Sequence, residues 1–277
     1  MKIKKVFLGI FIVFLFILTA CSNNDVSEHI SSIQDASNKA AQLESGEFSY
    51  VNVIEGEDEK HTQETEGLFV VQDNYVDWHT ELVVGENNNK TLSETIQKDK
   101  TRYQRFGRIN EDYQFIGNDD KVLTEELEWQ IANEDAVGYP DYLESIMNLE
   151  INEEDIEKVE KKEENNLTIY EVDYNDTYLS SVKQNNISEI KEQLDKAKEE
   201  DADSNVISSL EDSLSYNENI TYKRIELILT VDNTGVLIGG ELQSSFEQII
   251  NGSEQNIQMT QKVEILEYNE TDIKVEL

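Results

Sequence analysis

The sequence predicts an α+β fold: a curved antiparallel β-sheet with an N-terminal helix and a helical insertion that forms a lid. Apolar and polar residues alternate over residues 76–84, as in a strand with one buried face. The strands expected in the last third run about 10–15 residues, longer than the usual 5–6, which is typical of a strongly curved sheet. Residues 26–45 and 186–216 instead place apolar side chains at helical spacing.

The composition is strongly acidic. The 277 residues include 23 basic and 59 acidic side chains, a formal charge of −36. This balance argues against nucleic acid as a partner, because its phosphates would be repelled. The single Cys, Cys21, excludes an internal disulfide framework and a Cys-rich metal site.

Residues 1–20 have the pattern of a secretory signal. Three Lys precede an apolar run over residues 6–18 that only Gly9 interrupts. The run is too short to span the ~30 Å of a bilayer interior, but it suits the apolar core of a signal peptide. We therefore expect a signal peptide over 1–20, a polar tether over 21–25 and a single domain over 26–277.

The motif Leu18-Thr19-Ala20-Cys21 resembles the lipobox of bacterial lipoproteins. The resemblance implies cleavage between Ala20 and Cys21, attachment of diacylglycerol to the Cys21 thiol, and residence on the outer face of the cell membrane. The alternative is an ordinary signal peptide followed by a chance Cys. The only Cys of the chain occupies the position that the motif requires, which favours the lipobox.

Residues 26–45 predict an amphipathic helix that Gly46 stops. Its narrow apolar stripe would be marginal alone, so the helix is expected to lie on the sheet. The stripe consists of Ile30, Ile33, Ser37, Ala40 and Leu43.

Antiparallel strands are predicted from residue 47 to about residue 117. A hairpin across Asp73-Asn74 joins residues 67–71 to residues 75–84. One face of the second strand carries Val76, Trp78, Thr80, Leu82 and Val84, and the other face carries Tyr75, Asp77, His79, Glu81 and Val83. Further strands are expected at 47–55, 91–98, 100–106 and 111–116.

The middle of the chain predicts helices and one hairpin. Pro140 opens a short helix. Residues 155–162 and 167–174 are expected to form a hairpin. Two helices within 186–216, separated by a break at 201–205, predict an αα-hairpin that covers one side of the sheet.

The last third has the clearest strand pattern. Residues 225–231 lead into a turn at 232–235, and the following strand bends at Gly239-Gly240. Asn251-Gly252 predicts the next hairpin. The apolar face continues through Ile257, Met259, Val263 and Ile265, and Ile273, Val275 and Leu277 close it.

This order of a lipobox, a helix, long antiparallel strands, a helical insertion and a final meander resembles the LolA/LppX-like superfamily. More narrowly, it is similar to uncharacterised lipoproteins of Gram-positive bacteria. The resemblance covers most of residues 26–277 and rests on the order of elements. It implies an incomplete β-barrel around an apolar hollow, with helices as a lid, in which relatives bind acyl chains or lipidated cargo. It supplies no catalytic residue, and this chain has a longer insertion and a more acidic composition than better-known members.

No set of residues with catalytic spacing is found. His29, His61 and His79 are scattered, no His-x-x-x-His or Glu-x-x-His pair supports a zinc site, and His79 falls on the polar strand face. A Gly-x-Ser-x-Gly motif and a Gly-rich phosphate loop are also missing from the sequence. The many carboxylate runs fit solvated surface charge better than a glycosidase pair. We therefore expect no enzyme activity, no cofactor and no metal.

One acidic segment could hold calcium. Asp201-x-Asp203-x-Asn205 and Asp212 place oxygens at positions 1, 3, 5 and 12 of an EF-hand-like loop. Val206 stands where that loop needs Gly, and Asp212 is shorter than the usual Glu. The alternative, a helix break in which Asp203 or Ser204 caps the next helix, is the better explanation.

The function hypothesis is a membrane-anchored extracytoplasmic protein that binds or carries an apolar, lipid-like ligand without catalysis. The alternative is a structural or regulatory protein of the cell envelope that acts through protein contacts of its acidic surface. The candidate cavity residues, which could equally be ordinary core, are Trp78, Leu82, Leu227, Phe246 and Met259.

Overall fold

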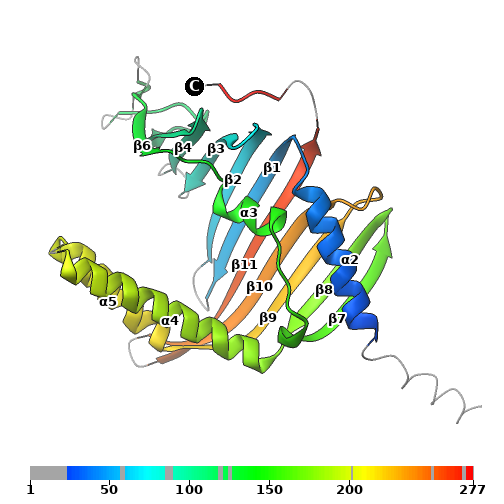
Figure 1. Ribbon diagram of the computed structural model, residues 1–277. Helices are drawn as coiled ribbons and strands as arrows, with labels where there is room; N and C mark the ends of the chain where they lie inside the picture. Colours follow the sequence, from blue (N-terminus) through cyan, green and yellow to red (C-terminus); the bar gives the residue numbers. More distant parts are fainter. Residues whose placement is uncertain are drawn as a thin grey trace, which may run out of the picture.

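The computed structural model describes residues 24–56, 60–84, 90–117, 121–123, 127–200, 202–250, 253–269 and 273–276. Within this part of the chain, eleven strands form one sheet that four α-helices accompany (Figure 1). The strands are β1 (Ser45–Glu55), β2 (Lys60–Val71), β3 (Val76–Val84), β4 (Lys90–Lys98), β5 (Thr101–Ile109), β6 (Gln130–Glu134), β7 (Ile156–Glu164), β8 (Leu167–Tyr174), β9 (Ile220–Val231), β10 (Leu237–Ile250) and β11 (Ser253–Tyr268). The α-helices are α2 (Asn24–Ala40), α3 (Asp141–Met147), α4 (Asp176–Glu199) and α5 (Ser204–Glu218), and a short 3-10 helix spans Glu153–Asp155.

The predicted fold class, a curved antiparallel sheet with an N-terminal helix and a helical insertion, is confirmed. The strand order is β6-β5-β4-β3-β2-β1-β11-β10-β9-β8-β7, and the neighbours pair antiparallel. Two meanders, β1–β6 and β7–β11, are joined where β1 pairs with β11. The described strands leave β6 and β7 at opposite edges, so the sheet is not closed.

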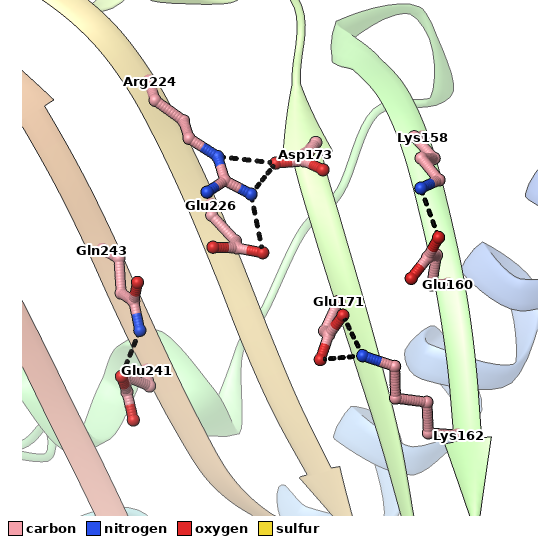
Figure 2. A network of polar contacts seen from close by, with 9 residues as sticks. All are labelled: Lys158, Glu160, Lys162, Glu171, Asp173, Arg224, Glu226, Glu241 and Gln243. Atoms are coloured by element: carbon pink, nitrogen blue, oxygen red, sulfur yellow. Dashed lines mark hydrogen bonds and ion pairs between the residues drawn. The ribbon is translucent and has the colours of Figure 1, made fainter.

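Helices α2, α3 and α4 lie against one face of the sheet, called here the inner face (Figure 1). Alternation along the strands places Leu227 and Leu229 on this face and Glu226 on the opposite, outer face. Figure 2 shows polar contacts of the outer face. Lys162 bridges to Glu171 at 2.6 Å, and other ion pairs link the neighbouring strands. A sheet face that carries charged pairs can remain in contact with water. The apolar inner face must instead be covered, and the helices cover it.

The core lies between the inner face and the two helices α2 and α3. The stripe predicted for the N-terminal helix is buried there, with Ile33, Ser37 and Ala40 at most 2% exposed. The Ser37 hydroxyl also links the helices, because it donates to the Ile146 carbonyl of α3 at 3.1 Å and accepts from the Leu149 N–H at 3.2 Å. A helix with so narrow a stripe therefore gains its stability from tertiary contacts.

Two phenylalanine rings of the core lie over glycines of the adjacent strand. Phe48 is paired with Gly67, and Phe69 is paired with Gly46. A Cβ at Gly46 would lie 2.7 Å from Phe69 Cε1. Gly46 was predicted to stop the first helix, and this is wrong: the helix ends at Ala40, and Gly46 lies inside β1. The Phe69 ring occupies the space that a side chain at position 46 would fill.

The strand predicted at 111–116 is wrong. The Asn110 side chain accepts from the N–H groups of Asp112 and Gln114, and Tyr113 has a φ of 59°, so the segment turns instead of extending. Within this segment, Phe115 and Ile116 each form one isolated β-bridge, to Ile109 and to Val122. Besides β4, the strand that pairs with β5 is β6, which the sequence did not indicate.

The helical insertion is longer than the predicted 186–216. The Asn175 side chain accepts from the Tyr178 N–H at 3.0 Å and starts α4 ten residues early. Helix α4 contacts β9, where Lys183 Nζ donates to the Ile220 carbonyl at 2.6 Å, whereas α5 packs on α4 and buries none of its side chains. The αα-hairpin is therefore confirmed, but it covers one end of the inner face and not a whole side.

Two other predictions concern the helix break and the C-terminus. Asp203 caps α5 by accepting from the Asn205 N–H at 2.8 Å, as the alternative to calcium binding required. Residues 273–276 form no strand, although Val275 is buried. Leu277 and the dipeptide Asn251-Gly252 lie outside the described residues. In the described part of the chain, no helix has both the length and the apolar character needed to cross a bilayer.

Candidate functional site: a hollow on the inner face

A hollow of about 520 Å³ opens on the inner face, between α3, the first turn of α4 and the central strands. Its floor is apolar, because β9, β10, β11 and β1 each direct every second side chain toward the helices. The floor residues are Leu227, Leu229, Gly240, Leu242 and Val263.

Gly240 helps to create the hollow. A Cβ at this position would lie 3.4 Å from Ile146 Cγ1 and 3.7 Å from Leu229 Cδ2, in the space between floor and helix. The adjacent Gly239 lies on the opposite side, where a Cβ would lie 3.4 Å from Thr230 Cβ. The predicted irregularity at Gly239-Gly240 is confirmed by a register shift between Leu237 and Gly239.

Two stacked tyrosine pairs form the walls. Tyr50 of β1 and Tyr142 of α3 have ring centroids 4.5 Å apart. Tyr174, the last residue of β8, and Tyr178, in the first turn of α4, have centroids 4.1 Å apart. Burial raises the pKa of Tyr142 to about 12 and raises the pKa of Tyr174 as well. The phenols are therefore uncharged at neutral pH, and the walls are aromatic surfaces without charge.

Polar groups line the hollow at few points. Gln261 Nε2 donates to the Tyr50 hydroxyl at 3.1 Å, which holds that ring in place. The carboxylates of Asp141 and Glu150 belong to exposed residues at the edge. None of the described lining residues is basic. The site therefore suits an apolar body and offers no cation to a negatively charged group.

A second, smaller hollow of about 290 Å³ lies beside the first. Its lining is more polar: Trp78 donates its indole N–H to the Gly138 carbonyl at 3.1 Å, and the Arg102 guanidinium lies 5.1 Å from the Trp78 ring. Tyr142 and Asp141 line both hollows, so the start of α3 separates them.

The structure distributes the five cavity candidates over three places. Leu227 lines the larger hollow, whereas Trp78 and Leu82 line the smaller one. Phe246 packs with Ile220, Ile257 and Met259 in a separate cluster at the end of the sheet that α4 covers. Leu18, Thr19, Ala20 and Cys21 lie outside the described residues.

Sequence reasoning missed the four wall tyrosines. Tyr142 lies on the short helix expected after Pro140, but no sequence pattern relates it to Tyr50. Tyr174 and Tyr178 are four positions apart at a strand-to-helix junction, and that spacing was the one available signal.

The fold and the hollow together define a class, an open antiparallel half-barrel with helices on its inner face. No known family model matches the chain, and no curated protein matches it. A solved DUF1329 family protein from Desulfovibrio piger is 9% identical and has a TM-score of 0.29, with 91% of this chain and 96% of that chain covered.

Two further solved structures are similar over most of their length. A putative outer membrane lipoprotein-sorting protein domain from Vibrio parahaemolyticus is 6% identical, covers 89% of this chain and 93% of its own, and has a TM-score of 0.20. The MucA/MucB complex of Pseudomonas aeruginosa is matched at 10% identity, 86% and 93% coverage and a TM-score of 0.14. At these TM-scores the likenesses carry no argument, and the site stands on its own geometry.

Proposed function

We propose that the protein is a lipid-anchored, extracytoplasmic binding protein that holds an apolar ligand in the larger hollow without catalysis. The observation that carries this proposal is the size and chemistry of the hollow. Its 520 Å³ lies within the ~300–1,000 Å³ range of small-molecule sites, and its floor and walls are aliphatic or aromatic. A core that only had to fold would fill this space with side chains.

The lining restricts the charge of the ligand. Asp141 and Glu150 at the edge repel anions, and no described lining residue supplies a cation to neutralise one. A free carboxylate or phosphate would have to remain in water, because burying an unpaired charge is costly. We therefore expect a ligand with an uncharged apolar part in the hollow and a neutral or cationic end outside it.

Membrane anchoring through Cys21 completes the proposal. Two residues separate Cys21 from Asn24, the first residue of α2, and a chain spans at most ~3.3–3.6 Å per residue. An acyl chain on Cys21 would thus hold the start of α2 within about 10 Å of the bilayer. The ligand would then be bound or released close to the membrane surface.

The binding proposal is tested by filling the hollow. The full chain is purified from membranes in mild detergent, and bound molecules are identified by native mass spectrometry. Gly240→Leu places a side chain inside the hollow, and Gly239→Leu makes the same change on the outer face. The expected result is an apolar adduct on the wild type and on Gly239→Leu that Gly240→Leu lacks. Circular dichroism checks that both variants are folded.

Two results would reject ligand binding: a wild-type chain that carries nothing and takes up no added apolar probe, or a folded Gly240→Leu variant with undiminished binding. The anchor is tested separately with Cys21→Ala. Loss of membrane attachment, or an unprocessed precursor, is expected. A variant that is processed and attached as before would reject the lipoprotein assignment.

A second candidate function, contact with a partner protein, is favoured by α5. This helix buries none of its described side chains, and Val206 and Tyr216 remain 49% and 45% exposed. The exposed face of α5, which carries these two side chains, is available to a partner protein. Exchange of acidic for basic residues in 186–216 should then abolish capture of a specific envelope protein, while apolar-probe binding in the hollow continues.

A further inference from the structure

Three metal-ligating side chains meet on the outer face of β3 and β4. His79 and Glu81 are two residues apart on β3, so both side chains leave the same face of the strand. Glu94 of β4 is the register partner of Glu81. Strand pairing thus brings one imidazole and two carboxylates together, although Glu94 and His79 are 15 positions apart in the chain.

The ligand atoms are almost close enough to share an ion. His79 Nε2 lies 3.8 Å from Glu94 Oε1 and 4.0 Å from Glu81 Oε1, and the three ligand atoms lie within 4.8 Å of one another. Zn²⁺ with ligands at ~2.0–2.2 Å in a tetrahedron requires separations of about 3.3–3.6 Å. Small changes of side-chain rotamer would close the difference, since Glu81 is exposed.

An unsatisfied atom points to a ligand at this position. His79 Nε2 is buried, and no described group forms a hydrogen bond with it. A buried nitrogen without a partner is unfavourable, and native structures avoid it. The lone pair of a neutral imidazole can instead bind a metal ion.

Arg105 holds the Glu94 carboxylate in a position suited to coordination. Arg105 pairs with Oε2, while Oε1 faces His79. The Arg105 guanidinium is itself fixed 4.4 Å from the Trp129 ring. Such an outer partner orients a ligating carboxylate.

We propose that His79, Glu81 and Glu94 bind a divalent transition-metal ion of the Zn²⁺ type on the outer face. One nitrogen and two carboxylate oxygens match the ligand preference of zinc, and they leave a coordination position for water. The bound ion would cross-link β3 and β4 through their side chains. This site is independent of the hollow and of the lipid anchor.

The proposal is tested by isothermal titration calorimetry, in which ZnCl₂ is added to the full chain in mild detergent. All samples carry Cys21→Ser, so that the thiol cannot bind metal, and an excess of Mg²⁺ occupies the diffuse acidic surface. One Zn²⁺ per chain is expected to bind tightly. His79→Gln and Glu81→Gln should each weaken this binding more than about 10-fold.

Glu164→Gln is the matched control, because it removes the same charge from an exposed glutamate at the end of β7. Its Zn²⁺ affinity should equal that of the wild type. Circular dichroism and thermal unfolding show whether each variant is folded, and Glu94→Gln is avoided because Arg105 depends on Glu94. A wild type without a saturable site above background, or a folded His79→Gln that binds like the wild type, overturns the proposal.

Discussion

The ring of Tyr142 lies flat against the ring of Tyr50, with 4.5 Å between centroids and 13° between planes. The pair connects α3 to the first strand of the sheet. Tyr142 also lines both the larger and the smaller hollow. One aromatic side chain therefore forms part of the wall and separates the two spaces.

Tyr142→Ala should join the two hollows. With the ring removed, longer apolar ligands are expected to bind better relative to short ones, because the enlarged space accepts more of the chain. The free energy of unfolding should fall by about 2–4 kcal/mol through the lost aromatic contacts. Competition between fluorescent acyl probes of different length measures the first effect, and urea unfolding measures the second. Tyr142→Phe, which keeps the ring, should preserve the wild-type length preference; an unchanged preference in Tyr142→Ala would contradict this role.

Gly67→Ala should destabilise the sheet. A Cβ at Gly67 would lie 2.5 Å from Phe48 Cζ and 2.6 Å from the His79 carbonyl oxygen, and the backbone atom cannot move away easily. We expect a loss of about 1–3 kcal/mol in the free energy of unfolding, measured by urea denaturation. Gly138→Ala is the control, because its Cβ would meet nothing closer than Glu144 Oε2 at 3.8 Å. Equal free energies of unfolding of the two variants would show that the packing of the Phe48 ring does not require a glycine at position 67.

Gln97→Leu should also lower stability. This fully buried amide donates to the carbonyls of Val76 and Gly138 at 2.8 and 2.9 Å, and its oxygen accepts from Arg102 at 3.1 Å. Leucine has a similar size but leaves these groups unpaired, at a cost of about 1–3 kcal/mol in the free energy of unfolding. The exposed Gln104, changed to Leu, is the matched control. A thermal midpoint of Gln97→Leu equal to that of the control would argue against the network.

Asp232→Asn should have an effect that depends on pH. Burial alone would raise the pKa of Asp232, but hydrogen bonds from Tyr268, from the Val236 N–H and from Thr234 outweigh it and lower the pKa below the usual value. The ionised carboxylate therefore stabilises the fold above the unfolded pKa of about 3.9, and this stabilisation is lost as pH falls through the lower folded value.

The measurement is the difference in free energy of unfolding between wild type and Asp232→Asn as a function of pH. We expect about 1–2 kcal/mol at neutral pH, decreasing as the pH falls below the unfolded pKa of about 3.9. Asp73→Asn, at an exposed turn, should show a smaller difference throughout. A difference that does not change with pH would mean that the charge of Asp232 contributes nothing.

Local sequence signals located several turns correctly. The hairpin at Asp73-Asn74 is confirmed by the hydrogen bond from the Gln72 N–H to the Tyr75 carbonyl at 2.8 Å. The hairpin between β7 and β8 turns at Asn165 and Asn166, which have φ values of 52° and 66°. Both turns depend on neighbouring residues that favour tight backbone geometry, so a short window of sequence contains the necessary information.

Predictions failed where distant residues decide the outcome. Glycine is a typical helix terminator, but at Gly46 its lack of a side chain instead leaves room for the Phe69 ring of the next strand. Residues 111–116 alternate as a strand does, yet the Asn110 side chain satisfies their backbone in a turn. The start of α4 at Asp176 depends on the Asn175 cap, which helical periodicity does not reveal.

The site was only partly predictable for the same reason. Alternation along β9 and β10 placed the apolar floor on one face, and Leu227 is part of it. Whether that floor is covered by side chains or left open depends on where α3 crosses the sheet. The roles of Gly240 and Tyr142 in the hollow follow from that packing. The grouping of His79 with Glu94 likewise requires the register of β3 against β4.

The sequence by itself determined the α+β class, the strand and helix periodicities and most hairpins, because these depend on residues a few positions apart. Tertiary structure alone decided that β1 pairs with β11, that a hollow remains beneath α3, and that an imidazole meets two carboxylates on the outer face. Each of these features brings together side chains from separate strands or helices, and their contact follows from packing and register, which no local pattern encodes.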